Sequence, residues 1–322
     1  SNLINKRISL VFLFPLFLGM LTVFTFQPFN LTFLNFLIFP CLFAILVYVE
    51  KKSKSKYRKK PYLINLFYVG YFFGVGFFLT GTYWISHSLT FDSDLNYLIP
   101  LSLVLIPLCL GLFYGVSTII AGPFLKNNFS SILLFCATFS FLDYLRAKLF
   151  TGFPWNLWAY SWSWFYEIIQ ILNPIGLFAF NLITITLFCV PSIFFIKKLK
   201  FKNTIIVIFL ITFFGNYLYG NYILNDNKIK VQKLLEENKF TYIKIISPNF
   251  ELKYNLSEDE TLNRLKKLIR YSNIEKDKKT LFVWPEGALS GKYFFELKKY
   301  KNLIKKNFSQ KHLIVFGINT LD

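Results

Sequence analysis

The residue with the clearest chemical potential is Glu286, which follows an apolar run at 281–284 and then Pro285. Proline cannot donate to a sheet ladder, so the run is predicted to be a strand that ends at this point. Reactive groups of α/β sheets gather beyond the carboxyl ends of strands, and a carboxylate placed there can act as a general base. Because strand-end carboxylates are common, capping of the following turn is an alternative role for Glu286.

A second distinctive pair is Asp143 and Arg146, which lie three residues apart in a predicted membrane helix and therefore on one face of it. Ionisable side chains in hydrocarbon are costly and persist where they are paired or functional. The spacing is consistent with an ion pair that orients its surroundings and with a direct contact to a substrate.

Aromatic residues gather near the predicted outer ends of the membrane helices. The segment 151–160 combines Gly152 and Pro154 with large rings and almost no charge. It could belong to the aromatic belt at the membrane interface or line a groove that admits a lipid chain. For Trp84, which ends another apolar stretch, anchoring in the interface is the expected role.

The composition indicates what must hold these residues in place. Of 322 residues, 54% are hydrophobic and only 16% are charged, which argues against a fully water-soluble chain. Residues 224–322 hold 20 of the 36 Lys and Arg and 12 of the 17 Asp and Glu. We therefore predict a membrane domain at 1–223 and a water-soluble domain at 224–322.

Seven apolar stretches in the first domain are long enough to cross a bilayer, which takes about 20 residues. They lie at approximately 8–26, 31–49, 62–88, 97–122, 129–149, 168–196 and 204–223. No small-residue cleavage site follows the first stretch, so we expect a membrane span there and not a cleaved signal peptide.

The charges of the connecting loops predict the orientation of the spans. Basic residues favour the cytoplasmic side, and they occur at the N-terminus and in every even-numbered loop. These clusters are Lys6 with Arg7, seven Lys and Arg within 51–60, Lys126, and four Lys within 197–202. The odd-numbered loops, at 27–30, 89–96 and 150–167, are short of positive charge. Seven spans with this polarity put residue 224 outside the cytoplasm.

The second domain has the pattern of an α/β layer. Short apolar runs at 241–246, 281–284 and 312–317 predict strands. Ser257 with Glu260 forms a capping-box pattern at the start of a helix, and a second amphipathic helix is predicted over 294–308. Strands that alternate with helices indicate a largely parallel sheet.

Several classes of ligand are not indicated. The net charge of +19 is spread over short clusters and mixed with acidic residues, so no nucleic-acid partner is expected. The two histidines form no metal-ligand cluster and there is no Gly-rich phosphate loop, so neither a metal nor another cofactor is expected. The cysteines lie in apolar stretches and are predicted to be small core residues: Cys41, Cys109, Cys136 and Cys189.

Residues 283–288, with their order Trp, Pro, Glu, resemble the WPE segment of nitrilase-like (carbon–nitrogen hydrolase) domains. The position of this segment behind a bundle of membrane spans resembles the apolipoprotein N-acyltransferase family. Further segments resemble motifs of that family: 76–84, 143–146 followed by 152–155, and 247–249 followed by Lys253 and Tyr254. The resemblance implies a polytopic α-helical membrane bundle followed by a partial α/β nitrilase-like (αββα) domain.

The resemblance also implies the chemistry of a bacterial acyltransferase. A Glu, here Glu286, deprotonates a Cys thiol, the thiolate takes a fatty acyl chain from a membrane phospholipid, and a Lys stabilises the developing oxyanion. The acyl chain then passes from the thioester to the N-terminal amine of a diacylglyceryl-cysteine lipoprotein. The implied location is the bacterial inner (plasma) membrane, with the soluble domain on the periplasmic side. The residues implied in substrate binding are Tyr254, Asn249, Trp155, Phe153, Trp84 and Arg146.

The sequence departs from the family pattern in one important respect. The family's catalytic Lys and Cys lie well downstream of the WPE segment, but no cysteine follows Cys189, and Lys292 lies too close to Glu286. We therefore expect a C-terminally truncated fragment that is inactive alone. Two alternatives are a membrane-tethered nitrilase-like amidase, which hydrolyses its acyl-enzyme with water, and a non-enzymatic lipid-binding or transport protein.

Overall fold

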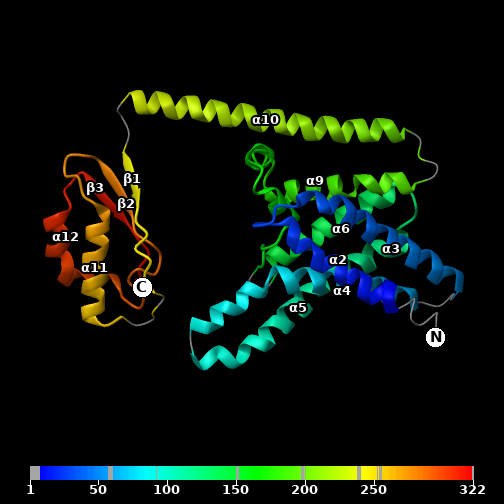
Figure 1. Cartoon of the computed structure of the whole chain (residues 1–322), viewed down its shortest axis with the longest axis horizontal. Coiled ribbons are helices and arrows are strands. Elements are labelled where there is room, and N and C mark those ends of the chain that lie inside the picture. Colours follow the sequence, from blue (N-terminus) through cyan, green and yellow to red (C-terminus); the bar gives the residue numbers. More distant parts are fainter. Residues whose placement is uncertain are drawn as a thin grey trace. The chain divides into compact units, whose positions relative to one another are not determined.

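The computed structural model describes residues 8–56, 61–91, 93–149, 152–196, 199, 201–237, 241–251, 253 and 256–320. The chain divides into two compact units, Ser1–Asp226 and Asn227–Asp322, and each has its own hydrophobic core. The first unit is helical, and the second carries a small sheet with helices (Figure 1).

Most helices of the first unit are long and apolar. Their bounds are α2 Phe14–Leu21, α3 Asn35–Lys56, α4 Pro61–Gly81, α5 Ile99–Ala121, α6 Phe129–Lys148, α7 Tyr166–Ile169, α8 Leu172–Ile175, α9 Leu177–Cys189 and α10 Lys202–Glu236, of which α10 continues past the end of the unit. The 3-10 turns include η4 Tyr83–Phe91, η7 Trp158–Trp162 and η8 Val190–Phe195. Within the described residues, six helical segments are long and apolar enough to cross a membrane. The chain is therefore a multi-pass membrane protein.

The predicted first span, 8–26, is a shorter apolar helical segment, Ser9–Thr25. It contains a π-helical turn at Ser9–Leu13, which follows the helical residue Ile8, and it ends as a 3-10 turn. A total of seven spans stays a prediction, whereas six segments have the full length.

Two glycines bring this first segment close to α4. A Cβ atom on Gly19 of α2 would lie 2.1 Å from the carbonyl oxygen of Phe73, and one on Gly76 of α4 would lie 2.1 Å from that of Leu16. Neither position has room for a side chain, so each helix is seated directly on the backbone of the other.

Replacement of Gly76 by Leu should therefore destabilise the bundle. We expect a loss of about 1–3 kcal/mol, since an overpacked helix contact forces the backbones apart. The thermal midpoint in detergent micelles measures the effect. Gly215→Ala is the matched control, because a Cβ atom on Gly215 of α10 meets no heavy atom within 4 Å. Equal midpoints for the two variants would contradict this account of the α2–α4 contact.

The second unit contains a three-stranded parallel sheet, which confirms the predicted strand arrangement. The strands are β1 Tyr242–Ile245, β2 Thr280–Val283 and β3 His312–Val315, in the order β1-β2-β3. Tyr242 pairs with Thr280, and Thr280 pairs with His312, so the strands are in register along their whole length. The helical elements are α11 Glu258–Ser272, η9 Phe294–Tyr300 and α12 Lys301–Asn307. The single helix predicted over 294–308 is thus a 3-10 helix followed by an α-helix.

Helix α11 begins at the predicted capping box. The backbone N–H of Glu260 donates to Ser257 Oγ at 3.2 Å, and the N–H of Ser257 donates to Glu260 Oε2 at 2.9 Å. These bonds satisfy two N–H groups that a helix start would otherwise leave unpaired. The helix ends at Asn273, whose φ of 40° is left-handed, as is common just beyond a helix.

The cap makes the stability of the second unit depend on pH. Hydrogen bonds from Lys253 and from Ser257 lower the pKa of Glu260 from 4.5 to about 2. This carboxylate should therefore stabilise the fold fully above pH 4.5, and the contribution should be lost as the pH falls toward 2. The measurement is the difference in thermal midpoint between the parent chain and Glu260→Gln. It should shrink below pH 4.5; a difference that stays constant down to pH 2 would rule the effect out.

The sheet is covered on one face and exposed on the other. Helix α11 packs on the covered face (Figure 1), and its Leu265 and Leu268 belong to a core that includes Phe282 and Trp284. The Trp284 indole donates to Ser272 Oγ at 3.2 Å, so it serves as a core residue of this unit. The opposite face presents side chains that are more than half exposed: Ile243, Ile245, Leu313 and Val315.

Candidate functional site

Glu286 lies just beyond the carboxyl end of β2 with its side chain exposed. The N–H of Trp284 donates to Val315 O at 2.9 Å and continues the ladder, after which Pro285 ends it. Gly287 has a φ of 70°, so the chain turns immediately after the carboxylate. Among the described residues no group donates a hydrogen bond to Glu286, and its carboxylate is available to a ligand.

The loops that follow β1 and β3 lie at the same edge of the sheet as Glu286. Asn249, three residues after Ile246, is exposed and has a left-handed φ of 50°. A Cβ atom on Gly317, beyond β3, would lie 3.8 Å from Glu286 Cγ. The small residue at 317 leaves room beside the carboxylate, and the parallel strands place these loops together.

Arg264, on α11, joins the loops that follow β1 and β2. The sequence patterns did not indicate this role. Its Nη2 donates to Glu251 O at 2.7 Å and its Nη1 donates to Ala288 O at 3.2 Å. The guanidinium also lies 4.7 Å from the centre of the Phe250 ring. The sequence indicates only that Arg264 lies close to the buried face of its helix, because it adjoins Leu265 and lies one turn before Leu268, which are both buried. It is placed to hold the segments after β1 and β2 in position.

The segment after β1 also contains Lys253, which forms an ion pair with Glu260. The pair links this segment to the start of α11. Tyr254, predicted to contact substrate, lies outside the described residues. Asn249 and Glu286 are thus the predicted site residues that the described part of the second unit contains.

The other predicted contacts lie in the first unit, around the loop that follows α6. The indole rings of Trp84 and Trp155 meet edge to face with centroids 5.4 Å apart. Both are about half exposed, and Phe153 is partly buried. The amide of Asn156 donates to Gly81 O at 3.3 Å, which fixes the loop to the end of α4. The described part of the bundle therefore brings Trp84 and the 152–156 loop together.

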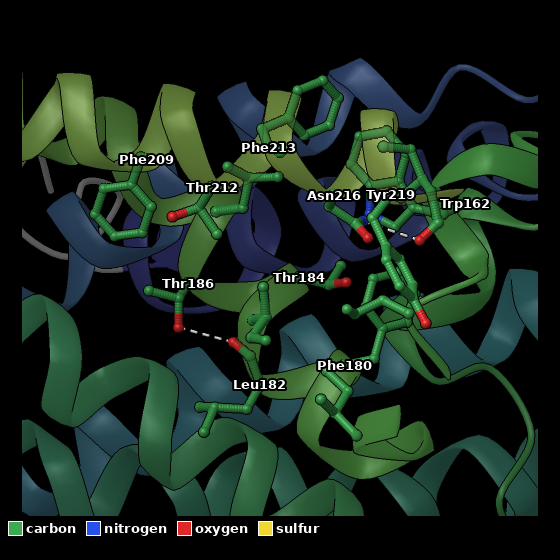
Figure 2. Close-up of a pocket in the computed structure, with 16 residues that line it drawn as sticks. Trp162, Phe180, Leu182, Thr184, Thr186, Phe209, Thr212, Phe213, Asn216 and Tyr219 are labelled. Carbon is green, nitrogen blue, oxygen red and sulfur yellow. Dashed lines mark hydrogen bonds between the residues drawn. The ribbon is translucent and has the colours of Figure 1, made fainter. Parts of the chain in front are cut away.

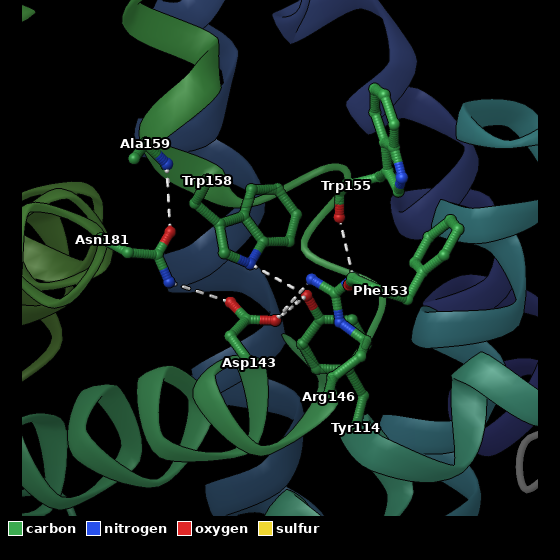
Figure 3. Close-up of polar contacts among 8 residues, drawn as sticks. All are labelled: Tyr114, Asp143, Arg146, Phe153, Trp155, Trp158, Ala159 and Asn181. Atoms are coloured by element: carbon green, nitrogen blue, oxygen red, sulfur yellow. Dashed lines mark hydrogen bonds and ion pairs between the residues drawn. The ribbon is translucent and has the colours of Figure 1, made fainter. Parts of the chain in front are cut away.

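A buried polar network supports this loop (Figure 3). Asp143 Oδ1 accepts hydrogen bonds from Tyr114 Oη at 3.0 Å and from Arg146 Nη2 at 3.1 Å. Asp143 Oδ2 accepts one from Asn181 Nδ2 at 3.0 Å. The indole of Trp158 donates to Tyr114 Oη, and Asn181 Oδ1 accepts from the N–H of Ala159. One carboxylate thus connects α5, α6, α9 and η7.

Arg146 links the network to the loop. Its Nη1 donates to the carbonyl oxygens of Phe153 at 2.8 Å and Trp155 at 2.7 Å. The side chain is fully buried, and its charge is paired with Asp143 (Figure 3). The ion pair expected at this spacing is confirmed, and the guanidinium holds the loop backbone. A direct contact between Arg146 and a substrate stays a prediction, because it would require these bonds to be exchanged.

Comparisons with known proteins identify a family for the helical part of the chain. Residues 18–190 match the model of the family described as the apolipoprotein N-acyltransferase N-terminal domain. This region contains α4, α6 and the loop that Arg146 holds. The match covers more than half of the chain.

Several curated relatives carry the name apolipoprotein N-acyltransferase, and three of them show the extent of the similarity. The protein of Rickettsia bellii is 29% identical over 256 residues, which are 78% of this chain and 49% of the relative. The protein of Rhizobium etli is 26% identical over 229 residues, or 69% of this chain and 42% of the relative. The protein of Rickettsia prowazekii is 27% identical over 296 residues, which are 90% of this chain and 56% of the relative.

The chain spans about half the length of these curated relatives. The similarity to the two Rickettsia proteins extends over most of it, as the resemblance of its motifs implied. Together with the family match across the helical bundle, this shows that the chain belongs to the apolipoprotein N-acyltransferase family.

Proposed function

We propose that this chain takes part in the transfer of a fatty acyl chain from a membrane phospholipid to a lipoprotein. The acceptor is the N-terminal amine of a diacylglyceryl-cysteine, and the acyl chain passes through a Cys thioester. The family and the names of the curated relatives support the general activity. The single observation that carries the chemistry is Glu286, an exposed carboxylate at the carboxyl edge of a parallel sheet, without a protein donor in the described residues.

In this proposal Glu286 is the general base. It takes the proton of a Cys thiol, and the thiolate attacks the carbonyl carbon of a phospholipid ester. The ester C–O bond breaks, the thioester forms, and the leaving alkoxide receives the proton. The lipoprotein amine then attacks the thioester, loses a proton, and releases the thiol. A Lys ammonium stabilises each tetrahedral oxyanion.

The thiol and the Lys would come from a further part of the protein, because the four cysteines precede the second unit. The sheet of that unit would then be one layer of a larger nitrilase-like domain. Its exposed apolar face, with Ile245 and Leu313 each more than 60% exposed, supports this idea. Parallel sheets are ordinarily covered on both faces, so such a face calls for a partner layer.

The predicted lipid contacts follow from the same proposal. Trp84 and Trp155 have the half-exposed, amphipathic rings that suit a membrane interface, and Phe153 belongs to the same loop as Trp155. Asn249 and Tyr254, the latter outside the described residues, and Arg146 are proposed as further substrate contacts. The second unit would lie on the periplasmic side of the inner membrane.

The test uses the protein at the full length that its gene encodes, reconstituted in vesicles. A phospholipid with a radiolabelled acyl chain is supplied together with a diacylglyceryl-cysteine lipopeptide. Label on the lipopeptide amine supports the proposal. If the lipopeptide stays unlabelled while a soluble amide is hydrolysed to free acid, the amidase alternative replaces it.

A further inference from the structure

The carboxylate of Glu286 is carried on a tight turn whose two ends are held in different ways. The N–H of Ala288 donates to Pro285 O at 3.3 Å, so Glu286 and Gly287 are the two central residues of the turn. Its first end continues directly from β2 and the sheet ladder. At its other end Ala288 is buried, and its carbonyl oxygen accepts a hydrogen bond from Arg264 Nη1 at 3.2 Å. A side chain of α11 therefore holds the far end of the turn that carries the carboxylate.

The same guanidinium holds the segment that follows β1. Arg264 Nη2 donates to Glu251 O at 2.7 Å, and the guanidinium carbon lies 4.7 Å from the centre of the Phe250 ring. The ammonium of Lys267, about one turn later on α11, lies 5.2 Å from the same ring centre. Cations at such distances are attracted to the face of an aromatic ring, so Phe250 is fixed against α11. One side chain thus connects the segment after β1 to the turn after β2.

Helix α11 holds Arg264 firmly in place. Leu265 and Leu268 are fully buried in the core of the second unit, and the helix starts at the capping box of Ser257 and Glu260. An Arg side chain suits the task, because its planar fork can donate to two carbonyl oxygens at once, whereas a Lys ammonium is a compact charge on a flexible stem. The guanidinium therefore sets the spacing of two loops that are distant in the sequence.

Arg264 contacts the backbone of these loops and not the carboxylate itself. Its printed partners are the carbonyl oxygens of Glu251 and Ala288, and in the described part of the unit it forms no ion pair with Glu286. An effect of Arg264 on the chemistry of Glu286 is therefore expected to arise from where the loops are held.

We propose that Arg264 is a positioning residue for acyl transfer, which sets where the Glu286 carboxylate stands relative to the segment that contains Asn249. The assignment rests on the proposed function, because this position affects catalysis only if Glu286 is the base. Without the two hydrogen bonds, the turn after β2 is free to shift away from the segment after β1. A misplacement of about 1 Å can lower the rate of an enzyme about 10²-fold.

The structural part of the proposal is tested without any activity. The protein at full length is placed in nanodiscs, and hydrogen exchange is followed by mass spectrometry in the peptide that covers 285–290. Arg264→Met should speed the exchange of the Ala288 amide at least about ten-fold, as expected when a hydrogen bond from a charged group is lost. Met is unbranched and a good helix former, so α11 should stay folded, which circular dichroism checks.

Arg270→Met is the matched control for the exchange experiment. Arg270 is exposed near the other end of α11, where its guanidinium lies over the Tyr271 ring. The control should exchange like the parent, and Arg264→Lys should exchange faster than the parent, because one ammonium replaces at most part of the two bonds. Unchanged exchange in Arg264→Met, equal acceleration in the control, or full retention of protection by Arg264→Lys would each overturn the positioning role.

The link to catalysis is tested by a double-mutant cycle. The rate of acyl-enzyme formation is measured across pH with a labelled phospholipid at saturating concentration. Arg264→Met should lower the rate by about 10–10²-fold at every pH and leave the acid limb of the profile where it is in the parent, because Glu286 is still the base. In the Glu286→Gln background the same substitution should cost less than about two-fold, since a positioning residue acts through the group that it positions.

The outcomes of the cycle separate this assignment from the proposed function. An equal loss of rate in both backgrounds would indicate a general loss of structure and overturn the assignment. Normal transfer by Arg264→Met in an active parent would overturn the assignment alone. A parent that forms no acyl-enzyme would overturn the proposed function, and the catalytic part of the assignment with it.

Discussion

Replacement of Glu286 by Gln should lower acyl transfer by about 10²–10⁴-fold, the usual contribution of a general base. The amide cannot take the thiol proton, but it keeps nearly the same size. Because the side chain is exposed and no described group donates to it, the fold should be unaffected. The variant is made in the protein at full length, and its acyl-enzyme is measured with a labelled phospholipid.

Glu275→Gln is the matched control for this experiment. Glu275 is an exposed carboxylate of the same unit, but it precedes β2 and pairs with Lys244 and Lys278 at the opposite edge of the sheet. Its loss should change transfer by less than about two-fold, since exposed ion pairs contribute little. Normal acyl-enzyme formation by Glu286→Gln would remove Glu286 from the role of base.

Replacement of Asp143 by Leu should destabilise the helical bundle by about 3–5 kcal/mol, since it leaves the charge of Arg146 buried without a partner. The substitution also removes the acceptor for Tyr114 and Asn181. The loop that Arg146 holds should loosen as a consequence. The loss is measured as a lower thermal midpoint in detergent micelles and as faster proteolysis within 152–156.

The double variant Asp143→Leu with Arg146→Met separates the charge from the rest of the network. Removal of both charges should recover most of the lost stability, because a buried pair replaced by apolar residues is often nearly neutral. Tyr144→Phe serves as the matched control, since Tyr144 is about 40% exposed on the same helix. A double variant as unstable as Asp143→Leu would show that the ion pair is not the source of the effect.

The elements of the second unit were predictable because each depends on near neighbours in the sequence. The strand at β2 is a short apolar run closed by Pro285, and α11 begins at a capping box of Ser257 and Glu260. The parallel order followed from the alternation of strands and helices. The boundaries were less predictable: a helix expected over 294–308 is divided at Tyr300, where local turn geometry competes with amphipathic periodicity.

The membrane bundle shows the same contrast between local and distant information. Apolar length identified the spans, and the described part of the first of them is the segment Ser9–Thr25. Its turns relax into π and 3-10 geometry at the two ends, where contacts with α4 decide the backbone path. An apolar groove lined by residues of α9 and α10 (Figure 2) had no signal in the sequence, because it depends on how α10 is held against distant parts of the bundle, as by the bond from Asn216 to Ile168 O.

The sequence by itself indicated a bundle of helices apolar enough to cross a membrane, an alternating strand-and-helix unit, a carboxylate after β2, and the position of Asp143 and Arg146 on one face of a helix. Only the tertiary structure decided that Asp143 also binds Tyr114 and Asn181, which lie 29 and 38 residues away in the chain. It likewise decided that Arg264 joins the loops after β1 and β2. Periodicity and capping act within one or two helical turns, whereas the partner of a buried polar group is fixed by how distant helices pack.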